Sequence, residues 1–165
     1  MTFLLFIAIC KNSLGNQFQY LLVSMKKIGG VIVSHGQLAT ELLAAAETVI
    51  GNLSHVVAVS IGWHDDVDAA KDEIARAIKN VSEDAGVLLM TDMFGGTPTN
   101  ISAMFLEEGK VEMVTGVNLP MLIKFATHSK DATLSDLARE VESQGKQSIY
   151  RTAALLEPAK MKRNA

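Results

Sequence analysis

The fold is decided by the stretch Ile28-Gly29-Gly30-Val31-Ile32-Val33-Ser34-His35-Gly36. Its run of β-branched residues is typical of a strand that is buried on both faces, as in the parallel sheet of an α/β protein. Residues 37–51 then show apolar residues at helical spacing, so His35 lies in a turn between a strand and a helix. Open α/β sheets bind their ligands at the carboxyl ends of their strands, and His35 lies at such an end. His35 is therefore a candidate for reaction rather than for packing.

Strands and helices alternate along the chain beyond this stretch. The pattern predicts strands over residues 28–34, 55–61, 86–91 and 111–115, with a last, less regular strand over residues 149–155. It predicts helices over residues 37–51, from Asp65 or Asp66 to Val81, over residues 97–108 and 121–127, and from Thr133 onward. Four successive strand–helix units predict a doubly wound, mostly parallel α/β sheet with helices on both faces, for which we expect the strand order 2-1-3-4.

Composition narrows the class of protein. The 165 residues are 48% hydrophobic, enough for one domain with a core. The net charge is −3, and Lys and Arg cluster only in residues 160–163, so a nucleic-acid partner is not expected. The single cysteine, Cys10, excludes an internal disulfide framework and a thiolate-rich zinc site. The four histidines show no metal-ligand spacing, and we expect neither a metal nor another cofactor.

Residues 1–24 differ from the rest of the chain. The apolar run Phe3–Cys10 is far shorter than the roughly 20 residues that span a bilayer. One interpretation is that Met25 is the native start and that residues 1–24 are not native or are disordered; a membrane anchor or a secretion signal is the alternative. The expected organisation is therefore an extension over residues 1–24, one domain over residues 25–156 and a tail over residues 157–165.

Two strand exits combine into one candidate site. In the order 2-1-3-4 the first and third strands are neighbours, so we expect His35 and Asp92 to come within hydrogen-bond reach. A carboxylate that accepts a hydrogen bond from imidazole Nδ1–H leaves Nε2 bare, as a nucleophile or a base. This pair predicts a reactive histidine.

The turn after Asp92 suits an anion. Gly95, Gly96 and Thr97 precede a predicted helix and offer backbone N–H groups, a hydroxyl and the positive end of a helix dipole, which suit a phosphate. Ser34 and Asn118 lie at strand exits as well and are candidate supporting residues. Each residue also has a purely structural interpretation as a cap or a turn residue. Together they favour phosphoryl transfer through a phosphohistidine.

The chain resembles the EIIA domain of the mannose/fructose/sorbose family of the bacterial sugar phosphotransferase system. The resemblance rests on four segments in the right order and spacing, residues 30–36, 42–47, 91–100 and 116–122. It implies that His35 is the phosphorylated histidine, that Asp92 is its supporting carboxylate and that Thr97 takes the place of a hydroxyl that is commonly a serine.

The resemblance also implies partners and a location. Phosphorylated HPr would donate the phosphoryl group to His35, and an EIIB protein would accept it for sugar uptake, so the chain would act as a cytoplasmic phosphotransferase that meets the membrane only through the permease complex. The family sheet ends in an antiparallel edge strand, here residues 149–155, that is exchanged between the subunits of a homodimer.

Other functions remain open at this point. A regulatory phosphohistidine protein without a sugar permease would use the same site, and a flavodoxin-like module could bind an anion there without reaction. A histidine phosphatase is less well supported, because Ser34 stands where such an enzyme needs an arginine. The sequence does not specify a sugar.

Overall fold

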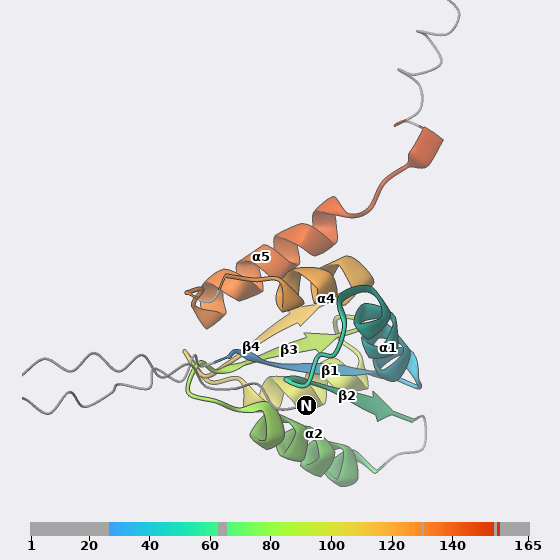
Figure 1. Ribbon diagram of the computed structural model, residues 1–165. Helices are drawn as coiled ribbons and strands as arrows, with labels where there is room; N and C mark the ends of the chain where they lie inside the picture. The colour runs from blue at the N-terminus through green and yellow to red at the C-terminus, as the bar shows by residue number, and fades with distance from the viewer. Residues whose placement is uncertain (1–26, 63–65, 130, 154, 156–165) are drawn as a thin grey trace, which may run out of the picture.

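The strand that contains His35 lies in the interior of a four-stranded parallel sheet. The computed structural model describes residues 27–62, 66–129, 131–153 and 155, and its sheet has the order β2-β1-β3-β4 (Figure 1). The strands are β1 (Gly29–His35), β2 (Val56–Ile61), β3 (Val87–Thr91) and β4 (Val111–Thr115). Both neighbours of β1 run parallel to it, with Val33 paired to Val59 and to Thr91. The predicted strand order is confirmed.

Burial explains which strands lie inside the sheet. Every residue of β1 from Gly29 to Ser34 is buried, and so is every residue of β3, whereas all five residues of the edge strand β4 are only half-buried. Continuous apolar runs are needed only where helices cover both faces of a strand. The sequence of β1 therefore indicated its interior position.

Helices cover both faces of the sheet (Figure 1). The helices α1 (Leu38–Ile50), α4 (Leu119–Ala126) and α5 (Leu134–Gln147) enclose one apolar core with the sheet, in which Phe125 is fully buried. The helices α2 (Val67–Val81) and α3 (Thr97–Ser102) enclose the other core. Asp66 caps α2 by accepting a 3.0 Å hydrogen bond from the N–H of Asp68.

The helix predicted over residues 97–108 is shorter than expected. The helix α3 ends at Ser102 and continues as the 3₁₀ turn η1 (Ala103–Phe105). The chain must then reverse to enter β4, and the backbone N–H groups of Lys110 and Val111 donate to the carbonyl of Glu107 at 2.9 and 2.8 Å. This turn needs the left-handed backbone of Gly109, which has a φ of 73° and cannot belong to a helix.

The antiparallel strand expected over residues 149–155 is not confirmed. In the described part of this segment, residues 149–151 have no regular structure, and Thr152, Ala153 and Leu155 are helical. A strand needs a neighbouring strand to satisfy its N–H and C=O groups, and after α5 the chain leads away from the sheet (Figure 1). The predicted extension over residues 1–24 and the tail over residues 157–165 lie outside the described residues.

Candidate functional site

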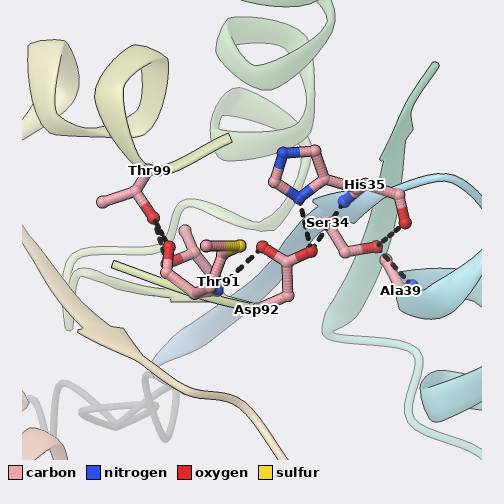
Figure 2. Close-up of polar contacts among 7 residues, drawn as sticks. Ser34, His35, Ala39, Thr91, Asp92 and Thr99 are labelled. Carbon is pink, nitrogen blue, oxygen red and sulfur yellow. Dashed lines mark hydrogen bonds and ion pairs between the residues drawn. The ribbon is translucent and has the colours of Figure 1, made fainter. Parts of the chain in front are cut away.

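His35 and Asp92 meet at the carboxyl edge of the sheet, as their strand exits predict (Figure 2). His35 is the last residue of β1, and Asp92 directly follows β3. One carboxylate oxygen, Oδ2 of Asp92, accepts a hydrogen bond from the backbone N–H of His35 and another from its ring Nδ1, both at 2.8 Å. The other oxygen, Oδ1, accepts the N–H of Met93 at 2.8 Å.

The environment keeps Asp92 charged. Burial by itself would raise the pKa of Asp92, but the hydrogen bonds from the His35 backbone and ring, the His35 charge and the Met93 N–H together hold this pKa below its ordinary value of 3.8. The carboxylate therefore contributes stability that is present above the ordinary carboxyl pKa and is lost as the pH falls through the lowered one. At neutral pH the carboxylate only accepts, so in the neutral form of the ring the proton is assigned to Nδ1 and Nε2 carries a free lone pair.

The free side of the imidazole faces solvent and Gly96. The His35 side chain is 36% exposed, against 10% for Asp92, and its Nε2 points away from the carboxylate (Figure 2). A Cβ placed on Gly96 would lie 2.7 Å from Cε1 and 3.2 Å from Nε2 of His35. The backbone of Gly96 therefore approaches the reactive nitrogen as closely as it does only because this residue has no side chain.

Ser34 precedes His35 in β1 and supports the turn that follows it. Its fully buried Oγ accepts the N–H of Ala39 at 2.6 Å, which ties the first turn of α1 to the end of β1 (Figure 2). The left-handed backbone of Gly36, with a φ of 54°, allows the sharp turn between them. Ser34 thus ties the end of β1 to the start of α1, with His35 between them.

Thr97 and Asn118 have different surroundings. Thr97 is the first residue of α3 and is exposed, next to Gly96. Asn118 follows β4, which β3 separates from β1, and its Oδ1 caps α4 by accepting the N–H of Met121 at 3.2 Å. The structure therefore places Thr97 beside the residue that approaches His35, whereas Asn118 acts as a helix cap.

Two buried threonines that the sequence pattern does not single out complete the site. Thr91 ends β3 and Thr99 lies in the first turn of α3, and their hydroxyl oxygens are 2.8 Å apart. Thr99 also donates a 2.5 Å hydrogen bond to the carbonyl of Met93. In the sequence Thr91 follows the apolar run 87–90, but Thr99 stands between Pro98 and Asn100, where its polarity does not mark it.

Neither a metal centre nor a membrane helix accompanies this site within the described ranges. No group of three or more His, Cys, Asp or Glu side chains among those residues is arranged to hold a metal ion. No helix over the same residues is both long and apolar enough to cross a bilayer.

Comparison with known proteins identifies one family. The family model EIIA-man, described as the phosphotransferase system fructose IIA component, matches residues 29–142. The fructose-specific EIIA component of Bacillus subtilis (strain 168) is 28% identical over 134 residues, which cover 81% of this chain and 92% of that protein. The sorbose-specific EIIA component of Lacticaseibacillus casei is 29% identical over 108 residues, which cover 65% of this chain and 78% of that protein.

A solved structure agrees with these relatives. The mannose/sorbose-specific IIA subunit of the phosphotransferase system from Enterococcus faecalis superposes with a TM-score of 0.68 at 25% identity, over 76% of this chain and 94% of that one. The matched region runs from β1 into α5 and so includes the sheet and the His35–Asp92 pair. The chain therefore belongs to the mannose/fructose/sorbose-type EIIA family, whose members are phosphoryl carriers of the bacterial sugar phosphotransferase system.

Proposed function

We propose that His35 Nε2 accepts a phosphoryl group from phosphorylated HPr and passes it to an EIIB protein during sugar uptake. The observation that carries this proposal is the contact between Asp92 Oδ2 and His35 Nδ1, which directs Nε2 away from the carboxylate at a partly exposed position. Members of this family work with HPr and EIIB proteins, which are themselves phosphoryl carriers.

The transfer needs few groups beyond this pair. The Nε2 lone pair forms a bond to phosphorus while the bond between phosphorus and the donor nitrogen breaks, and the electron pair of that bond returns to the donor ring. The positive charge that develops on the His35 ring is stabilised by the Asp92 carboxylate through Nδ1–H. Exchange between two imidazoles is nearly symmetric in energy, so the protein contributes mainly positioning.

We propose that Gly95, Gly96 and Thr97 hold the phosphoryl oxygens. Gly96 supports this role because its backbone lies next to Nε2 of His35, at a place where a side chain on residue 96 would contact the ring. The left-handed backbone of Gly95, with a φ of 81°, turns the chain toward α3 at this point. The hydroxyl of the exposed residue Thr97 would donate a hydrogen bond to one of the phosphoryl oxygens.

We further propose that two copies pair through residues 149–155 and that the exchange takes place in the cytoplasm. The pairing is supported by β4, whose outer edge has no strand partner among the described residues beyond one bridge between Glu107 and Val111, and by the exposure of Ile149 and Tyr150, which is 81% and 65%. An edge strand with free N–H and C=O groups is a template for another strand.

The phosphoryl site is tested by intact-mass measurement. The full chain is incubated with phosphoenolpyruvate, enzyme I and HPr, and we expect one acid-labile phosphoryl adduct that is absent in His35→Ala. His128→Ala is the matched control, because it removes a second half-buried histidine that packs against Phe125 and not against Asp92. An unchanged mass of the wild type, or an adduct that persists in His35→Ala, would overturn the assignment.

A further inference from the structure

Two buried threonine hydroxyls hold the loop that carries Asp92, through the carbonyl of Met93. Thr91 is fully buried and Thr99 is 3% exposed, so both hydroxyls are shielded from water. The Thr91 hydroxyl lies 2.8 Å from the Thr99 hydroxyl, which in turn lies 2.5 Å from the carbonyl oxygen of Met93 (Figure 2).

Each hydroxyl has only one proton to donate, and this settles which group is the donor in each of these two hydrogen bonds. A carbonyl only accepts, so the single proton of the Thr99 hydroxyl points to the Met93 carbonyl. The bond between the two threonines must then be donated by Thr91. Thr91 is itself fixed in the sheet, because its carbonyl accepts the N–H groups of Gly116 and Val117 at 2.9 Å each.

Met93 is therefore held at both ends of its backbone. Its carbonyl accepts from Thr99, and its N–H donates to Asp92 Oδ1 at 2.8 Å. The same carboxylate uses Oδ2 to orient the His35 ring through Nδ1. Hydrogen bonds, linked through the backbone of Met93 and the carboxylate of Asp92, thus connect the Thr91 hydroxyl to the reactive imidazole.

We propose that Thr99 is a positioning residue for phosphoryl transfer at His35. By holding the Met93 carbonyl, it fixes the Met93 N–H that selects the orientation of the Asp92 carboxylate, and through Asp92 it fixes the tautomer and direction of the His35 ring. Thr99 makes no contact with the reacting nitrogen and acts only through Met93 and Asp92. The inference rests on the proposed function for its kinetic part alone.

The test compares Thr99→Val with Thr99→Ser. Valine matches threonine in shape but removes the hydroxyl, and it leaves the Met93 carbonyl and the Thr91 hydroxyl without their partner. We expect the rate of His35 phosphorylation by phosphorylated HPr to fall about tenfold to a hundredfold in Thr99→Val, as for a catalytic group displaced by a fraction of an ångström to about an ångström. Thr99→Ser keeps the hydroxyl and is expected to retain most of the wild-type rate.

Ser102→Ala is the matched control. Ser102 lies on the same helix α3, and its Oγ is buried without a hydrogen-bond partner among the described residues. Its removal therefore tests the loss of a buried hydroxyl from α3 without loss of the connection to Met93. The rate in Ser102→Ala is expected to equal that of the wild type.

A spectroscopic measurement separates positioning from plain stabilisation and needs no phosphoryl donor. The ¹⁵N shifts of the His35 ring, recorded well above the usual histidine pKa of about 6.5, report which nitrogen carries the proton. We expect Nδ1–H in the wild type and in Thr99→Ser, and a shift of the population toward Nε2–H in Thr99→Val. A slower Thr99→Val that keeps the wild-type tautomer would overturn the inference, and so would a Thr99→Val with the wild-type rate.

Two other results are possible: Thr99→Val could fail to fold, or the wild type could fail to be phosphorylated. Each still tests the inference. If Thr99→Val does not fold, Thr91→Val takes its place: it removes only the donor to Thr99, the same tautomer shift is expected in smaller proportion, and a wild-type tautomer there would contradict the inference. If the wild type is not phosphorylated at all, the proposed function fails, while the tautomer comparison still decides whether Thr99 orients His35.

Discussion

The two carboxylate oxygens of Asp92 accept hydrogen bonds from three N–H groups. Replacement of Asp92 by asparagine therefore tests whether phosphoryl transfer needs an acceptor at both oxygens. In Asp92→Asn, an amide NH₂ that faces His35 would donate to Nδ1, and the ring proton would move to Nε2, the nitrogen that must attack phosphorus. We expect phosphorylation of His35 to slow on the order of 10²-fold or more, within the range known for misplaced acid–base groups. Rapid-quench kinetics with phosphorylated HPr measures this rate.

The matched control for Asp92→Asn is Asp66→Asn. Asp66 caps α2, and asparagine is as good a cap as aspartate, so this variant makes the same chemical change away from His35. Circular dichroism and the thermal midpoint should show that both variants keep the fold. Equal rates in Asp92→Asn and the wild type would show that the carboxylate is incidental.

The C-terminal segment shows how the length and partner of an element depend on what lies beside it. Residues 149–155 have a pattern that predicts a strand, yet the described residues there are irregular or helical. The helix α3 is also shorter than its sequence pattern, since after Ser102 the chain continues as the 3₁₀ turn η1 and then turns into β4. In both cases a local preference gave way to the hydrogen-bond partners that the chain finds.

At the scale of this segment we expect self-association that depends on Ile149. Ile149→Asp removes an exposed apolar side chain from the segment that would pair with β4 of a second copy, and sedimentation of the full chain should change from dimer to monomer. Val49→Asp makes the same change at an exposed apolar position of α1 and should stay a dimer. A wild type that sediments as a monomer at micromolar concentration contradicts the proposed pairing.

Across the whole molecule, the two edges of the sheet have different chemistry. The carboxyl edge carries His35 and Asp92, whereas His55 lies before β2 at the opposite edge and stacks on the buried ring of Phe125, with ring centroids 5.7 Å apart. Burial lowers the pKa of His55 below 6.5, and the charges of Lys27 and His128 lower it further, against the opposing effect of Glu83. Neutral His55 is therefore the form that the folded protein stabilises.

This lowered pKa predicts how global stability depends on pH. The unfolded chain binds a proton at the ordinary histidine pKa, but folded His55 binds it only at lower pH, so the free energy of unfolding decreases as the pH falls below about 6.5. Denaturant titrations at neutral and mildly acidic pH should show this decrease, and His55→Gln should reduce it. The same pH dependence in His55→Gln and in the wild type would assign the effect to other groups.

The sequence by itself determined the four parallel strands and the central pair of the site. Continuous apolar runs and turn residues are properties of short stretches, so they identified β1 and β3, and the strand order then predicted that His35 and Asp92 meet. Only the tertiary structure decided that Gly96 lies against Nε2, that Asn118 caps a helix and that Thr99 holds Met93. The physical reason is that such contacts depend on how a folded loop directs individual N–H, C=O and hydroxyl groups, and no periodic pattern in the sequence encodes those directions.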